Sequence, residues 1–225
     1  MDALLGTRRK FLGWTNWILT AGGLAGQARP LAAAGAARAS AEGEDYYDKL
    51  GVAKIINAAG TYTVLTASTM PPQVQAAVAR AAKHPVRLLE LQKAAGEYLA
   101  KQLRCEAALV TAGASSALTL GMAGCLTVAN KLGILQIPNN VGSVKNEVII
   151  QKGHRYGYDH ALEVCGARFV EVETMQQYEA AFNDRTVMTH FFNASERGQI
   201  GREDWLRVAH SHGIPSFNDA AADVP

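Results

Sequence analysis

The segment Ala107–Leu126, AALVTAGASSALTLGMAGCL, determines the expected fold of this chain. Its first five residues, Ala107–Thr111, form a short apolar run that predicts a buried strand. The run breaks at Gly113, and apolar residues then recur at helical spacing, at Leu118, Met122, Cys125 and Leu126. The segment therefore predicts a strand, a tight turn and the start of a helix.

The turn in this segment has the features of an anion-binding site. Gly113 permits a tight backbone turn, and Ser115 and Ser116 place hydroxyl groups and free backbone N–H groups at the start of the helix. Unpaired N–H groups and the helix dipole both favour a phosphate at such a position. An ordinary strand-to-helix connection with serine caps fits these residues equally well.

The remainder of the chain alternates between strand and helix patterns. Strands are expected at 148–150, 169–172, 186–191 and 215–217, and helices at 159–165, 175–182 and 203–212. Repeated βα units of this kind predict the α/β class, with a mostly parallel sheet in a three-layer α/β/α arrangement. Ligands of such sheets bind at the carboxyl ends of the strands.

Upstream of the strand at 107–111, the pattern predicts two helices and a short extended segment. The extended segment covers Leu50–Ala59, and the first helix begins at Pro71-Pro72 because proline is tolerated in the first turn. The second helix is expected at about 87–103, with an inward face formed by Leu88, Leu91, Ala95, Leu99 and Leu103.

The N-terminal segment has the pattern of an export signal. The residues TRRKFL at 7–12 match the twin-arginine motif, and a weakly apolar segment at 14–25 and small-residue cleavage sites follow. We therefore expect export through the twin-arginine route to the periplasm or another extracytoplasmic compartment. The expected organisation is a signal peptide at 1–39, a linker and N-terminal arm at 40–70, and a large α/β domain at 71–225.

The charge and cysteine content exclude several kinds of partner. The formal net charge is +2, but residues 1–39 alone carry +4, so the remainder carries −2. No nucleic-acid partner is therefore expected, and without a long apolar run no membrane association is expected after signal removal. Three cysteines lack metal-ligand spacing, so we expect no metal site and interpret them as small buried hydrophobic residues, namely Cys105, Cys125 and Cys165.

Polar residues follow three of the expected strands, and their order is informative. His154, Asn193 and Asp219 each come shortly after a strand, although a single histidine or aspartate there is more often structural. A phosphate turn, then a ring that can stack, then a strand-end carboxylate is the order that holds pyridoxal phosphate. The carboxylate keeps the pyridine nitrogen protonated, and the ring can then withdraw electrons.

Five segments of the chain carry a family resemblance between about Tyr46 and Pro225. They are IINAAGTYT (55–63), ELQKAAGEYLAKQL (90–103), VTAGASSALTL (110–120), KGHRYGYDHALEVCGARFVEV (152–172) and PSFNDAAADVP (215–225). Together they resemble the selenocysteine-synthase-like branch of the fold-type-I pyridoxal-phosphate-dependent enzymes. That branch includes seryl-tRNA selenium transferases and D-glucosaminate-6-phosphate ammonia-lyase-type proteins.

The resemblance implies a site for pyridoxal 5′-phosphate and a role for each matched residue. His154 would stack on the pyridine ring, and Asp219 would pair with the pyridine nitrogen. The phosphate would bind at Gly113, Ala114, Ser115 and Ser116, and the substrate side would include Asn57, Thr61 and Asn193. Enzymes of this branch are typically homo-oligomers, so the resemblance also implies self-association of the full-length form.

The resemblance places the Schiff-base lysine downstream of Asp219, but the sequence contains no lysine after Lys152. We therefore expect an incomplete large domain that lacks the catalytic lysine, and no catalytic residue is assigned. Lys152 is a poor substitute because it lies at the end of an earlier strand.

The expected function is that of a lyase or transferase dependent on pyridoxal phosphate. It would act through an aldimine on a small-molecule substrate, a small amino acid or an amino sugar acid, with this chain as an N-terminal part of the enzyme. A tRNA substrate is not expected because the mature part is slightly acidic. The alternative is a non-catalytic truncated pseudoenzyme or interaction remnant. A dinucleotide-binding domain is disfavoured because the Gly113 turn lacks G-x-G-x-x-G.

Overall fold

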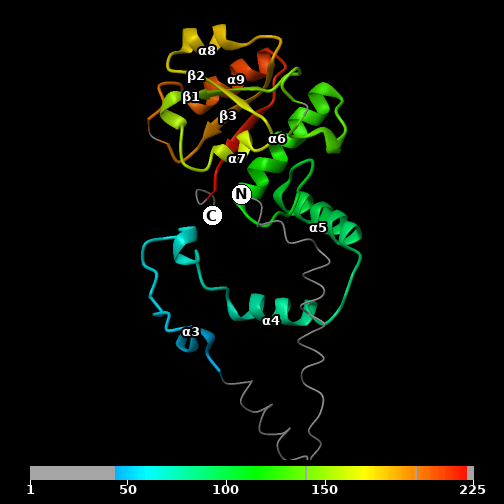
Figure 1. Cartoon of the computed structure of the whole chain (residues 1–225), viewed down its shortest axis with the longest axis vertical. Helices are drawn as coiled ribbons and strands as arrows, with labels where there is room; N and C mark the ends of the chain where they lie inside the picture. The colour runs from blue at the N-terminus through cyan, green and yellow to red at the C-terminus, as the bar shows by residue number, and fades with distance from the viewer. Residues whose placement is uncertain (1–43, 140, 196, 222–225) are drawn as a thin grey trace, which may run out of the picture. The chain divides into compact units, whose positions relative to one another are not determined.

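The computed structural model describes residues 44–139, 141–195 and 197–221 (Figure 1). The predicted signal peptide at 1–39 lies outside these residues. The chain divides into two compact units, of which the first ends at Ala67 and the second begins at Ser68. Within the described ranges, no helix is both long enough and apolar enough to cross a membrane.

The described part of the first unit contains one short helix and one helical turn, joined by irregular segments. Helix α3 spans Tyr46–Lys49, and the 3-10 helix η1 spans Thr63–Leu65. The Asp45 carboxylate caps α3 by accepting a hydrogen bond from the backbone N–H of Tyr47 at 2.9 Å. No strand forms in the segment 50–59, so the extended segment expected there makes no sheet.

The second unit contains a four-stranded, all-parallel sheet. The strands are β1 (Glu147–Gln151), β2 (Arg168–Val172), β3 (Thr186–Phe192) and β4 (Ser216–Asp219), in the order β2-β1-β3-β4. β1 and β3 are central and almost entirely buried, as their runs of Val, Ile, Met and Phe indicate. All four strands expected downstream of residue 140 are confirmed.

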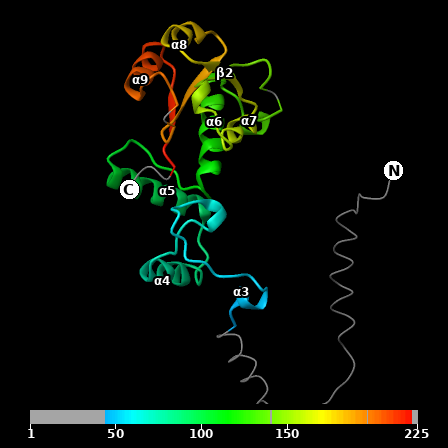
Figure 2. The same ribbon diagram turned by 90° about the vertical axis from the view of Figure 1, so that its left-hand side faces the viewer.

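Helices cover both faces of this sheet, which confirms the three-layer α/β/α class (Figure 2). One layer contains α6 (Ala114–Asn130) and the short α7 (His160–Glu163), joined to β1 and β3 by a core that includes Leu118, Met122, Leu126, Leu162, Val148 and Met188. The other contains α8 (Met175–Ala181) and α9 (Arg202–Ser211). There the Tyr178 and Trp205 rings stack at 3.8 Å within a second core.

Helix α6 runs antiparallel to the strands, and this direction positions its first turn. At its last residue, Asn130 exchanges two side-chain hydrogen bonds of 2.9 Å with the backbone of Lys145, just before β1 begins. The C-terminal end of α6 therefore lies at the amino end of β1. Its N-terminal end consequently lies at the carboxyl ends of the strands, where ligands of such sheets bind.

The segment 107–111 is not a strand, which corrects the expectation for it. Its backbone pairs with none of the described strands and instead packs against α5, the helix Leu88–Leu103 that follows α4 (Pro72–Ala81). The Gln92 side chain donates to the Val110 carbonyl oxygen at 2.6 Å. A Cβ on Gly96 would lie 2.5 Å from the Ala108 carbonyl oxygen, so helix and segment approach closely.

This close approach also corrects the predicted inward face of α5. The residues that α5 buries are Gly96 and Ala100, because only small side chains fit against the backbone of 107–111. Three residues predicted to face inward are instead exposed, namely Leu88, Leu91 and Leu103. The second unit also contains two short 3-10 helices, η2 (Ile134–Gln136) and η3 (Lys152–His154).

The substitution Gly96→Ala tests this packing. We expect it to lower the free energy of unfolding by about 1–3 kcal/mol, because the added methyl group overlaps a backbone carbonyl that cannot rotate away. Gly124→Ala in α6 is the matched control, since a Cβ there meets nothing within 4 Å and alanine favours a helix by up to about 1 kcal/mol. Urea denaturation measures both, and equal effects of the two substitutions would contradict the packing.

Candidate functional site

The first turn of α6 is open to an anion. Gly113 precedes the helix with φ at +142°, a backbone conformation that favours glycine, and no side chain caps the helix. The Thr111 hydroxyl donates to the Gly113 carbonyl oxygen at 2.9 Å and so stabilises the turn. The N–H groups of Ala114, Ser115 and Ser116 point out of the first turn without partners inside the helix.

The carboxylate of Asp219 lies at the same end of the sheet, where β3 and β4 finish side by side. Phe192 pairs with Asp219 in register, and the Asn193 N–H donates to the Asp219 carbonyl oxygen at 2.9 Å. The Asp219 side chain is buried. Its Oδ1 accepts from the Ala221 N–H at 3.1 Å, and its Oδ2 accepts from the Tyr156 hydroxyl. The structure thus brings Asn193 and Asp219 together at the strand ends.

Tyr156 is an aromatic residue in direct contact with this carboxylate. Its ring stacks on Phe192 with centroids 4.0 Å apart and an interplanar angle of 5°. Burial and the hydrogen bond to Asp219 raise the pKa of Tyr156 above its ordinary value, so the phenol keeps its proton. The sequence prediction missed Tyr156, although it follows the predicted His154 by two residues in the same loop.

His190 lies behind Tyr156 and completes a buried hydrogen-bonded chain. Its Nε2 is 3.3 Å from the Tyr156 hydroxyl oxygen, and burial lowers the pKa of His190 to about 4. At neutral pH the ring is therefore uncharged. The Tyr156 hydroxyl donates its single proton in the hydrogen bond to Asp219. In the contact with His190, the protonated nitrogen of the imidazole is therefore Nε2, and it donates to the phenol oxygen. Within the described residues, His190 Nδ1 has no hydrogen-bond partner.

An ion-pair network holds the loop that carries Tyr156. Arg155 binds Asp159 at 2.5 Å and Glu171 at 2.7 Å, and its guanidinium lies 4.2 Å from the centre of the Phe169 ring. The Asp159 carboxylate also accepts from the Tyr156 N–H at 3.2 Å. The side chain of Asp159 is only 5% exposed, so this charge depends on its partners.

His154 is buried beside the end of β3. Its ring contacts Phe191 edge-on at 4.5 Å, and its Nδ1 accepts from the Phe192 N–H at 3.2 Å. Burial lowers the pKa of His154, so this acceptor role suits a neutral ring. The structure therefore places Tyr156, rather than His154, in contact with Asp219.

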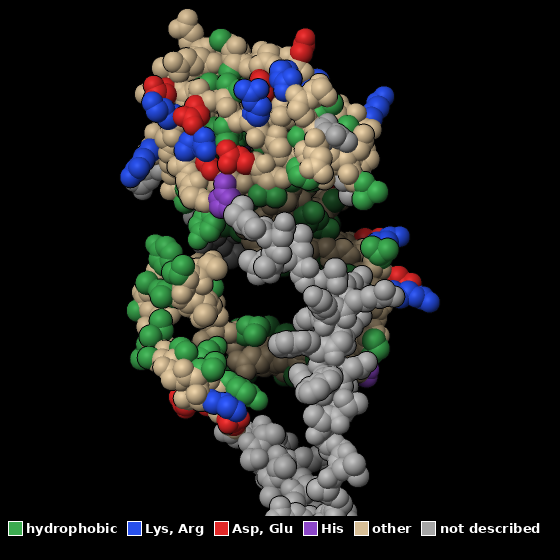
Figure 3. All heavy atoms as spheres, viewed as in Figure 1, with side chains coloured by type: hydrophobic (Ala, Val, Ile, Leu, Met, Phe, Trp, Pro, Cys, Tyr) green, Lys and Arg blue, Asp and Glu red, His purple; other side chains and the backbone are tan. Residues whose placement is uncertain are grey.

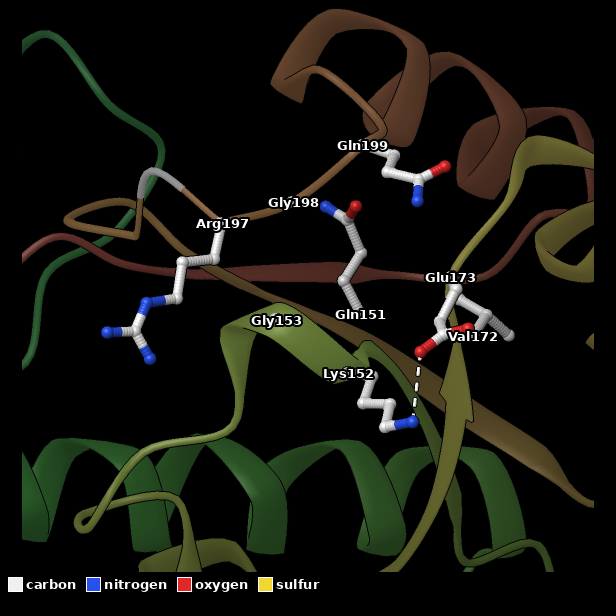
Figure 4. A pocket seen from close by; sticks show the side chains of 8 residues that line it. All are labelled: Gln151, Lys152, Gly153, Val172, Glu173, Arg197, Gly198 and Gln199. Carbon is white, nitrogen blue, oxygen red and sulfur yellow. Dashed lines mark ion pairs between the residues drawn. The ribbon is translucent and has the colours of Figure 1, made fainter.

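A hollow of about 230 Å³ lies beyond β1 and β2 (Figure 4) and is lined by Gln151, Lys152, Gly153, Val172, Glu173, Arg197, Gly198 and Gln199. The Lys152 ammonium pairs with Glu173 at 3.0 Å, and that interaction raises the pKa of Lys152. Lys152 therefore stays protonated and is a poor amine nucleophile.

Acidic and basic side chains are interspersed on the visible face of this unit (Figure 3).

Asn57 and Thr61 belong to the first unit. The Asn57 amide donates to the carbonyl oxygens of Gly60 at 2.8 Å and Ala67 at 2.7 Å, so it organises the loop between them. Thr61 is exposed in that loop.

The structure also shows where the cysteines lie. Cys105 is exposed, which corrects the expectation that all three cysteines are buried, whereas Cys165 is buried. Among the described residues, no group of three His, Cys, Asp or Glu side chains is arranged to hold a metal ion.

Comparisons with known proteins agree with this fold and with the sequence motifs. No family model matches the chain. The chain is 30% identical over 189 residues to D-glucosaminate-6-phosphate ammonia lyase of Salmonella typhimurium (strain 14028s / SGSC 2262), which covers 79% of this chain and 51% of the relative. It is 29% identical over 191 residues to 5′-C-glycyluridine monooxygenase-decarboxylase of Streptomyces sp, covering 79% and 48%.

A solved structure gives the same result. The structure of D-glucosaminate-6-phosphate ammonia-lyase superposes with a TM-score of 0.72 at 29% identity, over 79% of this chain and 51% of that one. The chain thus has the parallel α/β fold of the pyridoxal-phosphate-dependent transferase large domain. Within that fold it is related to D-glucosaminate-6-phosphate ammonia lyase, as the motifs indicate. It spans about half the length of the curated relatives that it matches.

The buried His190 predicts an acid-sensitive fold. Burial, which outweighs the attraction of Asp219 and Asp159, lowers its pKa from 6.5 to about 4. Between these values the unfolded chain binds a proton that the folded chain does not. Stability therefore falls as the pH drops from 6.5 toward 4, by about 3 kcal/mol in total. His190→Gln removes this titration.

Urea denaturation at pH 7, 6 and 5 measures the effect. We expect His190→Gln to reduce the loss of stability between pH 7 and pH 5 relative to the wild type. His84→Gln, at an exposed histidine, is the control and should follow the wild type. If His190→Gln lost stability with pH as steeply as the wild type, the neutral buried imidazole would be disproved.

Proposed function

We propose that this chain binds pyridoxal 5′-phosphate and carries the cofactor side of the active site of a lyase that acts on a small amino acid or amino sugar acid. One observation supports this most strongly. The uncapped first turn of α6 and the buried carboxylate of Asp219 lie at the same end of one parallel sheet. That pairing offers one site for a phosphate and another for a protonated ring nitrogen.

The residues present fit the chemical groups of this cofactor. The first turn of α6 supplies backbone N–H donors, the Ser115 and Ser116 hydroxyls and the positive end of the helix dipole, all of which suit a phosphate. Asp219 is an acceptor held in place by two donors, Ala221 and Tyr156. An ionised carboxylate at this position stabilises a protonated pyridine nitrogen.

The chain's own residues have definite tasks in this proposal. The α6 turn binds the phosphate and so fixes one end of the cofactor. Asp219 orients the other end and holds a proton at the ring nitrogen. When bound, the cofactor supplies an electron sink for bond cleavage beside the substrate amine. Asn193 lies at the end of β3, one residue beyond the partner of Asp219, where a substrate group can be contacted.

We propose as a second candidate function that these 225 residues bind the cofactor or a partner without catalysing turnover. Lys152, directly after β1, supports this candidate, because Glu173 holds its ammonium group protonated and an ammonium group is a poor nucleophile. The two candidates differ in whether the chain catalyses turnover.

Other features of the proposal come from the relatives and from the sequence. The name of the Salmonella relative specifies an amino sugar acid phosphate, which supports a small amino substrate of that class. We further propose that the full-length form is a homo-oligomer. We also propose export through the twin-arginine route, which the sequence pattern of residues 1–39 supports.

Titration with pyridoxal 5′-phosphate tests the proposed function. We expect the chain to bind the cofactor, and Asp219→Asn to weaken binding about tenfold or more, because an amide cannot stabilise the nitrogen's positive charge. Asp184→Asn, at an exposed aspartate, should leave binding unchanged. Absorbance and equilibrium dialysis measure the dissociation constants. Absence of binding by the wild type, or equal affinity of Asp219→Asn, would contradict the proposal.

A further inference from the structure

We propose that Tyr156 is a positioning residue of the cofactor site. Its hydroxyl fixes the Asp219 carboxylate in the orientation that receives the ring nitrogen, and His190 in turn fixes the hydroxyl. This inference rests on the proposed function and gives a role in it to two residues that were not among the site residues predicted from the sequence.

The first step concerns the freedom of the carboxylate. An aspartate carboxyl group rotates easily about its last side-chain bond, because that torsion has broad minima. In this structure each oxygen has its own donor, the Ala221 N–H on Oδ1 and the Tyr156 hydroxyl on Oδ2. Each carboxylate oxygen has a second lone-pair direction. Both donors therefore fix the plane of the group and leave acceptor capacity for a ligand.

The second step concerns the rigidity of Tyr156 itself. Its ring stacks on Phe192 at 4.0 Å and is parallel within 4° to the His190 ring, whose centroid is 6.0 Å away. Its backbone N–H is held by Asp159, which Arg155 also binds. Because the ring and the backbone of Tyr156 are both held in place, its hydroxyl group has a fixed position and can hold the Asp219 carboxylate in one orientation.

The third step fixes the direction of the hydrogen bonds. A phenol has one proton, and the Tyr156 hydroxyl donates it in the hydrogen bond to the Asp219 carboxylate, which can only accept. The His190 Nε2 at 3.3 Å must then donate to the phenol oxygen. That assignment leaves Nδ1 unprotonated, which agrees with the lack of a partner for Nδ1 among the described residues. The two hydrogen bonds therefore run in one direction. His190 donates to the Tyr156 oxygen, and the Tyr156 hydroxyl donates to the Asp219 carboxylate.

A double-mutant cycle tests this inference. The full chain is prepared as wild type, Tyr156→Phe, Asp219→Asn and the double variant, and each is titrated with pyridoxal 5′-phosphate. Tyr156→Phe keeps the ring stack and removes only the hydroxyl, so we expect about tenfold weaker binding, since the lost bond involves a charged acceptor. In the Asp219→Asn background the same change should alter affinity by less than about twofold, because the carboxylate on which Tyr156 acts is gone.

Two controls separate positioning from a general structural effect. Tyr158 is an exposed residue of the same loop, and the Tyr158→Phe variant should bind the cofactor like the wild type. Inorganic phosphate, which reports only on the α6 turn, should compete with similar affinity in the wild type and in Tyr156→Phe. A loss of phosphate affinity would show that the loop had been disrupted, and would overturn the positioning role.

The outcomes distinguish this inference from the proposed function. A wild type that does not bind pyridoxal 5′-phosphate would overturn the proposed function and the role of Tyr156 with it. A wild type that binds, with Tyr156→Phe and Asp219→Asn weakening binding independently, would overturn the role of Tyr156 and leave the proposed function standing. Coupling of about fivefold or more between the two positions would confirm the inference.

Discussion

The buried carboxylate of Asp219 is the constraint on which the site depends. An ionised group removed from water is costly unless donors compensate it. Here the donors come from three parts of the chain: Tyr156 in the loop after β1, His190 on β3 through Tyr156, and the Ala221 N–H after β4. The strand ends, the loop and the carboxylate therefore stabilise one another.

The direction of the sheet explains why the other site elements lie nearby. Parallel strands require crossover connections, and these return the chain so that the carboxyl ends of all the strands lie at the same end of the sheet. Helix α6 returns antiparallel to β1, as the Asn130 contacts with Lys145 show. The unpaired N–H groups of its first turn therefore lie at the end of the sheet where β3 and β4 finish. The topology of the sheet therefore explains why the proposed anion site and the Asp219 carboxylate lie at the same end.

The alternating pattern predicted the parallel sheet and its flanking helices because strand and helix periods differ clearly over these lengths. The positions of Gly113 before a helix and of Asp219 at the end of a strand were also predicted, since a turn glycine and a strand-end carboxylate are recognisable from the flanking patterns. The strand at 107–111 was predicted wrongly, because an apolar run does not reveal whether a neighbour is available to pair with it. The inward face of α5 was wrong because packing against a backbone selects small residues over leucines.

The role of Tyr156 was not predictable from spacing. His154 and Tyr156 are two residues apart in one loop, and only the three-dimensional path shows which ring reaches the carboxylate. The hydrogen-bonded chain likewise joins Tyr156 to His190, 34 positions later, and to Asp219, 63 positions later. Such contacts depend on tertiary packing, which sequence periodicity does not encode.

The most direct test of this account is a crystal structure of the chain grown with pyridoxal 5′-phosphate. The account predicts a single bound cofactor, with its phosphate on the N–H groups of Ala114–Ser116 and its ring nitrogen at the Asp219 carboxylate. A cofactor bound elsewhere, or a phosphate at the α6 turn with the ring directed away from Asp219, would contradict the claim that the helix end and the carboxylate form one site.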